Sequence, residues 1–179
     1  MSARLQSVRW WVISLVFLLA GIGLAAIFST RSASGGESHD RIVAEGAGTT
    51  IIHGGTGASG GFVPVLTTLA FHAEATGGHV TGSFDCLALA PEASTGPKSG
   101  QFTVNAMYVD GQITGAIVNG DTATLTGTAD VTGLGAGSNV GFTFMLRKGG
   151  PGATAVLTTS GLTFNEVLVE GAFKVHAED

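Results

Sequence analysis

From Ile42 onward, apolar and polar residues alternate along the chain with a period of two. The clearest example runs from Thr122 to Val131, where Ala, Leu, Gly, Ala and Val occupy one face. Four threonines and Asp130 occupy the other face. Because successive side chains of a strand point to opposite sides, this pattern predicts a strand with one solvated face. The β-branched threonines suit a pleated surface.

The same alternation recurs in other parts of the chain and predicts further strands. Its apolar rows are Leu69, Phe71, Ala73 and Ala75; Phe102, Val104, Ala106 and Tyr108; Phe142, Phe144 and Leu146; and Val169, Gly171, Phe173 and Val175. No stretch of this region shows the stripe of an amphipathic helix, and the 29 glycines argue against long helices.

Glycine-rich breaks separate these rows. Asp110-Gly111 and Asn119-Gly120 are typical of tight hairpins, because both dipeptides accept positive φ angles. Further breaks lie at residues 76–78, 96–97 and 149–152. The chain therefore predicts an all-β fold, an antiparallel β-sandwich or jelly-roll-like domain of roughly eight to ten strands over residues 42–179.

The N-terminal part has a different pattern. Residues 10–28 carry no charge and follow Arg4 and Arg9, which is typical of an export signal. The length approaches the ~20 residues that span a bilayer as a helix, and positive charge before it directs the rest of the chain outward. We expect residues 1–29 to be a signal peptide or a signal anchor and the domain to be secreted or extracytoplasmic. Cleavage and anchoring both stay open.

Between this apolar helix and the domain, residues 30–41 are small and polar, which predicts a flexible linker. From Gly35 onward the chain holds five basic residues against all 13 acidic ones, a net charge of −8. A nucleic-acid-binding protein needs a basic face to displace counterions from phosphate. This charge balance therefore excludes nucleic acid as a partner.

Cys86 is the only cysteine, so the exported domain contains no internal disulfide and depends on its apolar core. It lies two residues after Phe84 and shares its strand face. We interpret Cys86 as a small buried apolar residue rather than a reactive thiol.

Serine hydrolase chemistry has one weak candidate. Ser59 lies in the glycine-rich stretch 57–61, but the stretch does not match the Gly-x-Ser-x-Gly pattern of a nucleophile elbow. His53 and His72 are the histidines that could approach it. A flexible loop is the favoured interpretation.

Paired carboxylates would be needed by a glycosidase. The acids that come into question are Glu74, Asp85, Asp110, Asp121 and Glu166. Asp110 and Asp121 are adjacent to glycines, so a turn explains them. Glu166 is the acid that the pattern explains least well.

The sequence gives little support for a metal, cofactor or sugar site. The five histidines are His39, His53, His72, His79 and His176, and none of their spacings gives a ready metal site. His72 and His79 could become cross-strand neighbours, but two ligands bind weakly. Both tryptophans lie within residues 10–28, which leaves Tyr108 as the domain's only large polar aromatic. The sequence predicts no catalytic, cofactor-binding or metal-binding residues and no cofactor.

Four stretches carry a resemblance: GSFDCLALAP at 82–91, GQFTVNAMYVDGQITG at 100–115, TATLTGTADVTGLG at 122–135, and residues 149–175. Together they resemble uncharacterised exported bacterial β domains of secreted and surface proteins. The resemblance covers roughly residues 54–176 and consists of turn glycines and strand apolar residues. It implies export and β architecture, and it implies no catalytic residues.

These observations favour an exported noncatalytic β domain with a structural or interaction role at the cell surface or envelope. The alternative is a small extracytoplasmic hydrolase with a site built from loops. The expected partner is a protein or surface of unknown identity, and membrane contact would come only from residues 10–28 if they are not cleaved. Self-association through an unprotected edge strand is a third hypothesis.

Overall fold

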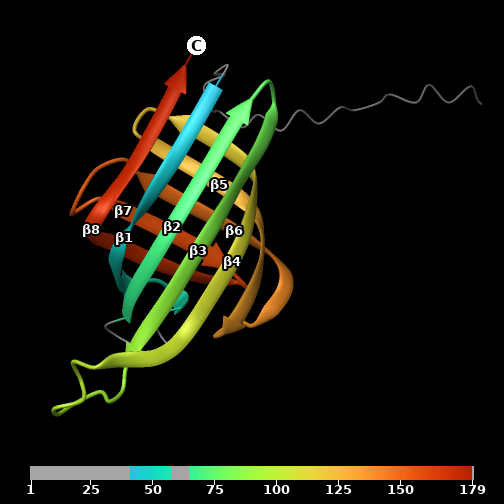
Figure 1. Ribbon diagram of the computed structural model, residues 1–179. Helices are drawn as coiled ribbons and strands as arrows, with labels where there is room; N and C mark the ends of the chain where they lie inside the picture. Colours follow the sequence, from blue (N-terminus) through green and yellow to red (C-terminus); the bar gives the residue numbers. More distant parts are fainter. Residues whose placement is uncertain (1–40, 58–64, 179) are drawn as a thin grey trace, which may run out of the picture. The chain divides into compact units, whose positions relative to one another are not determined.

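The computed structural model describes residues 41–57 and 65–178, which form one antiparallel sheet closed into a barrel (Figure 1). Each of its eight strands pairs with the next in sequence, and the last returns to pair with the first. The strands are β1 (Arg41–Gly54), β2 (Val65–Thr76), β3 (His79–Pro91), β4 (Phe102–Asn119), β5 (Thr122–Gly133), β6 (Gly137–Arg147), β7 (Thr154–Thr159) and β8 (Leu162–Glu178). Within these residues no helix is long and apolar enough to cross a membrane.

The prediction of an all-β antiparallel fold is confirmed, whereas the prediction of two packed sheets is wrong. β1 pairs with β2 on one side and with β8 on the other, so the sheet has no free edge. Alternation of period two is the same in a sandwich and in a barrel, because both bury one face of each strand. Closure also removes the edge strand that the self-association hypothesis required. The predicted N-terminal helix and residues 30–40 of the predicted linker lie outside the described residues.

The apolar face of β5 turns into the barrel as its alternation predicted. Ala123, Leu125, Ala129 and Val131 are all buried, while the threonines between them face outward. The rows on β2 and β6 are confirmed in the same way, with Phe71 and Phe144 in the interior. The barrel interior is therefore the hydrophobic core of the domain.

Five phenylalanines fill the middle of this core. The Phe144 ring is fully buried and lies 4.8 Å from the Phe84 ring and 5.3 Å from the Phe71 ring, measured between centroids. Phe142 stacks on Phe84 at 5.2 Å, and Phe173 lies 5.7 Å from Phe71. Rings at such separations gain favourable edge and face contacts as well as burial.

Glycines on the inner wall make room for these rings. A methyl group on Gly46 would lie 2.8 Å from the Phe71 ring, and one on Gly111 would lie 2.9 Å from the Phe142 ring. At Gly127 it would overlap the carbonyl oxygen of Gln112 on β4 and approach the Phe142 ring as well. Large and small residues thus alternate inside the barrel, as a narrow barrel requires.

Gly127→Ala is expected to lower the free energy of unfolding by about 2 kcal/mol, because the added methyl group has no space against a backbone oxygen. Gly141→Ala on β6 is the matched control, since nothing lies within 4 Å of the position of its methyl group. Urea denaturation of both variants tests this expectation. Equal stabilities of the two variants would contradict this assignment of Gly127 to a crowded inner wall.

On β4 the expected inward row is wrong. Met107 and Val109 are buried, whereas Tyr108 lies on the outer wall and Val104, near the start of the strand, is 38% exposed. Asp110-Gly111 is also not a turn, since both residues lie in the middle of this 18-residue strand. The register of β4 against β3 shifts at Ala106, since Ala88 pairs with Met107 and the next residue, Leu89, pairs with Asn105. Such an irregularity moves the alternation by one residue, so a single row could not run through it. The Asn119-Gly120 turn is confirmed, with φ of 55° at Gly120.

The expected row on β8 is interrupted by a bulge. Thr49 of β1 pairs with Glu170, but the next residue, Thr50, pairs with Leu168. Val169 is therefore an extra residue and is 43% exposed, while Phe173 and Val175 point inward as expected. A bulge shifts the alternation by one residue, and Gly171 beside it has φ of 105°.

Candidate functional site

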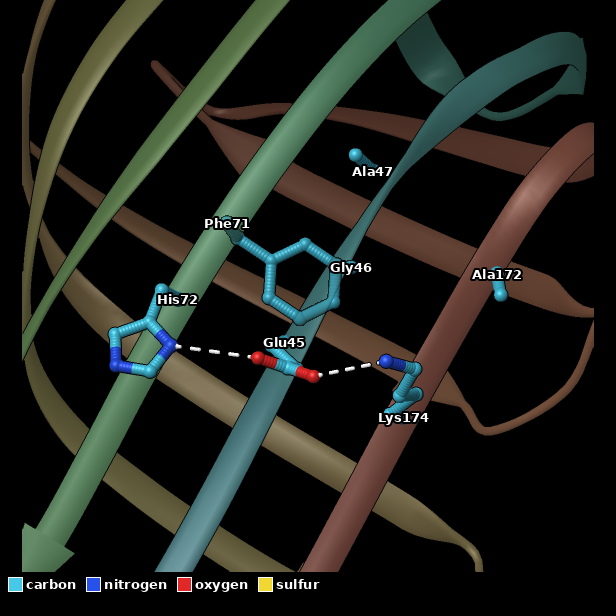
Figure 2. A pocket seen from close by; sticks show the side chains of 7 residues that line it. All are labelled: Glu45, Gly46, Ala47, Phe71, His72, Ala172 and Lys174. Carbon is cyan, nitrogen blue, oxygen red and sulfur yellow. Dashed lines mark hydrogen bonds and ion pairs between the residues drawn. The ribbon is translucent and has the colours of Figure 1, made fainter.

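A hollow of about 350 Å³ lies on the outer wall where β2, β1 and β8 run side by side (Figure 2). It is lined by Glu45, Gly46, Ala47, Phe71, His72, Ala172 and Lys174. Ala47 and Ala172 are direct cross-strand partners and leave space because their side chains are short. Longer side chains on three strands surround that space, and the Phe71 ring lies at its base.

A row of charged groups crosses the hollow. Glu45 is the direct partner of His72 on β2 and of Lys174 on β8. The Lys174 ammonium donates a hydrogen bond to Glu45 Oε1 at 3.1 Å, and His72 Nδ1 lies 3.9 Å from Glu45 Oε2 (Figure 2). Lys174 lowers the pKa of the Glu45 carboxyl by hydrogen bonding and by its charge. The hollow therefore presents an ionised carboxylate and an ammonium to solvent.

A second polar group lies inside the barrel. Glu166 on β8 is 1% exposed, between Phe164 and Leu168 on the inner face of its strand. The Thr50 hydroxyl donates a hydrogen bond to Glu166 Oε2, and Oε1 has no partner among residues 41–57 and 65–178. Thr67, the cross-strand partner of Thr50, is also buried, and its hydroxyl has no hydrogen-bond partner in the part of the chain that the structure describes.

Burial raises the pKa of the Glu166 carboxyl to about 7, and the hydrogen bond from Thr50 opposes part of this rise. An apolar environment disfavours the charged form of an acid. Glu166 therefore exchanges its proton near neutral pH. It is the acid that the sequence pattern explains least well.

The other candidate carboxylates lie on the outer wall. Asp85 and Asp110 are direct cross-strand partners, and Asp110 also pairs with Asp130, which forms a row of three acids on β3, β4 and β5. Such opposition of like charges costs stability. Asp121 forms an ion pair with Lys148 at 2.7 Å in the β4–β5 turn region. Glu74 on β2 interacts with Arg41 at 3.1 Å.

The histidine candidates do not form a common site. His72 pairs with Ser83 and His79 pairs with Thr76, so these two histidines are not cross-strand neighbours. His53 and His176 are exposed on β1 and β8. In the part of the chain that the structure describes, no group of three or more His, Cys, Asp or Glu side chains could hold a metal ion. Ser59 and His39 lie outside that part.

Cys86 is a buried free thiol on the inner wall of β3, as the sequence indicated. Burial raises the pKa of this thiol well above its ordinary value, and the charge of Glu166 acts in the same direction. The thiol therefore stays protonated and packs as an apolar group.

Tyr108 lies on the outer wall, where its hydroxyl donates a hydrogen bond to Asp85 at 3.0 Å.

Sequence reasoning missed four polar residues of these two sites: Glu45, Lys174, Thr50 and Thr67. Glu45 and Lys174 are distant in sequence, and only closure of the barrel brings them together. Thr50 follows Thr49 in a stretch without alternation, so no local pattern indicated which of the two faces inward. No family model, curated protein or solved structure in the three comparisons matches the chain.

Proposed function

We propose that residues 41–178 form a noncatalytic exported domain with a structural or interaction role at the cell surface or envelope. The observation that carries this proposal is the filled interior, in which Phe71, Phe84 and Phe144 occupy the middle of the barrel. A partner as large as a protein would then meet the outer wall. Export rests on the apolar residues 10–28 and the two arginines before them, as in the exported bacterial β domains that the chain resembles.

The hollow on β2, β1 and β8 is the part of the outer wall best suited to such contact. Its short side chains at Ala47 and Ala172 leave room for a side chain of the partner. Glu45 and Lys174 offer an acceptor and a donor beside that room. The hydrolase alternative has less support, because the residues lining the hollow include no hydroxyl or thiol nucleophile.

Site-specific photo-crosslinking in cells of the native host tests the proposal. A benzophenone amino acid at Ala47 is expected to give a discrete crosslinked product, because Ala47 lies in the hollow and is exposed. The same amino acid at Thr126, exposed on β5 away from the hollow, is the control. Identical products from both positions, or none from Ala47, would argue against an interaction surface at the hollow.

A further inference from the structure

The floor of the outer hollow belongs to a row of alanines that crosses three strands. Ala172, Ala47 and Ala70 are direct cross-strand partners on β8, β1 and β2, and all three are exposed. Neighbouring strands lie about 4.8 Å apart, so the row is roughly 10 Å long. Glu45 and Lys174 border it on one side (Figure 2). The row is therefore a shallow apolar strip beside a charged edge.

On β3 and β4 the same cross-strand row continues with two carboxylates. Ala70 pairs with Asp85, and Asp85 pairs with Asp110. These two strands follow β8, β1 and β2 around the wall (Figure 1). Both aspartates are exposed, and within residues 41–57 and 65–178 neither forms an ion pair with a basic side chain. Carboxylates that face each other across two strands repel, so a cation beside them would relieve the repulsion.

The charges around this row favour a basic partner over an acidic one. On the row and on the two cross-strand rows beside it, four carboxylates face one ammonium group, a balance of −3. The carboxylates belong to Glu45, Asp85, Asp110 and Glu170, and the ammonium group belongs to Lys174. Opposite charge speeds the encounter of two proteins, and like charge suppresses it.

Glu45 keeps an acceptor atom available at the hollow. Its Oε1 accepts the hydrogen bond from Lys174, whereas Oε2 lies 3.9 Å from His72 Nδ1, which is too far for a hydrogen bond. Oε2 accepts no other hydrogen bond from the residues that the structure describes. Lys174 holds the pKa of the Glu45 carboxyl below its ordinary value, so the group is ionised at neutral pH.

We propose that the hollow receives an arginine side chain from a basic segment of the partner, and that this segment continues across β2 toward Asp85 and Asp110. The guanidinium group donates a hydrogen bond to Glu45 Oε2, and its aliphatic stem lies on Ala47 and Ala172. Arginine suits this strip better than lysine, because its planar group is more weakly hydrated and packs on apolar and aromatic surface. The inference rests on the proposed interaction role and adds the chemistry of the partner.

The distance from the hollow to the aspartates sets the spacing of the basic residues. Ala47 and Asp110 lie three strands apart, which corresponds to about 14 Å. An extended segment covers this distance in roughly four residues. Residues i and i+4 of an extended chain share a face, so a second arginine four positions after the first reaches the aspartates.

Methyl NMR of the full chain labelled with ¹³C-methyl alanine tests the site. The probe is the peptide acetyl-Arg-Gly-Ser-Gly-Arg-amide, and the matched control peptide has the uncharged analogue citrulline at both arginine positions. We expect the arginine peptide to shift the signals of Ala47 and Ala172 saturably, with a Kd on the order of 0.1 mM. The signal of Ala155, buried on β7, should not move. The citrulline peptide should bind at least about tenfold more weakly.

Four variants locate the contacts. Glu45→Gln should weaken binding of the arginine peptide about tenfold, and Asp110→Asn should weaken it about threefold because Asp85 remains. Lys174→Met keeps the acceptor, removes the competing cation and should bind the peptide at least as tightly as the wild type. Asp121→Asn makes the same change in net charge at the β4–β5 turn and should change little.

Equal affinity for the arginine and citrulline peptides would overturn the inference, as would equal weakening by Glu45→Gln and Asp121→Asn. Weaker binding of the arginine peptide to Lys174→Met would also contradict it, because the ammonium group would then contribute to binding. Its failure is distinguishable from failure of the proposed interaction role. A crosslinked product from Ala47 in cells, together with equal affinity for the two peptides, would keep the interaction surface and refute the basic partner.

Discussion

Phe144→Ala is expected to lower the free energy of unfolding by about 3–5 kcal/mol, because it leaves a cavity in the middle of the barrel. Phe144 is fully buried and contacts the rings of Phe71, Phe84 and Phe173. The surrounding strands belong to a closed sheet and cannot move inward independently. Urea denaturation followed by circular dichroism measures the loss.

Phe102→Ala is the control for this substitution. Phe102 is half-buried at the start of β4, outside the central cluster, so its loss should cost about 1 kcal/mol. Similar losses for both variants would show that the aromatic cluster does not dominate the core.

Glu166→Gln is expected to remove most of the pH dependence of stability between pH 4.5 and about pH 7. The pKa of the carboxyl is 4.5 in the unfolded reference and about 7 in the folded protein. The stabilisation linked to this raised pKa is complete below pH 4.5 and is lost as the pH rises through 7. A rise of this size corresponds to about 3 kcal/mol.

The difference in unfolding free energy between the wild type and the Gln variant should therefore change by about 3 kcal/mol across that range. Denaturant unfolding at half-unit steps of pH measures it. Glu170→Gln changes an exposed position four residues further along β8. Its unfolding free energy should change with pH in the same way as that of the wild type. If the unfolding free energy of Glu166→Gln also changed with pH as that of the wild type does, the Glu166 carboxyl would have to be hydrated in the folded protein.

Local alternation predicted the strands but not their closure. The inner face of β5 and the Asn119-Gly120 turn were correct because both depend on neighbouring residues. Pairing of β1 with β8 joins residues more than a hundred positions apart, and alternation contains no information about which strands pair. The bulge at Val169 could not be predicted from the sequence for the same reason, since it depends on the register of β8 against Thr49 and Thr50 of β1.

The inward position of Glu166 could have been found from the sequence. It alternates with Phe164 and Leu168, both strongly apolar, in the stretch FNEVLVEG. An acid in an apolar row points into the core wherever that row does. Its hydrogen-bond partner Thr50 could not be found in this way, because Thr50 lies on β1, which only closure of the sheet places beside β8.

Closure of the sheet places Glu166 inside the barrel and brings the residues of the outer hollow together. Backbone NMR of the barrel tests it through contacts between β1 and β8. We expect nuclear Overhauser effects between the paired residues Ala44 and Val175, and between Gly46 and Phe173, with slow amide exchange on both strands. Fast exchange on both strands, without contacts between them, would contradict the closed barrel.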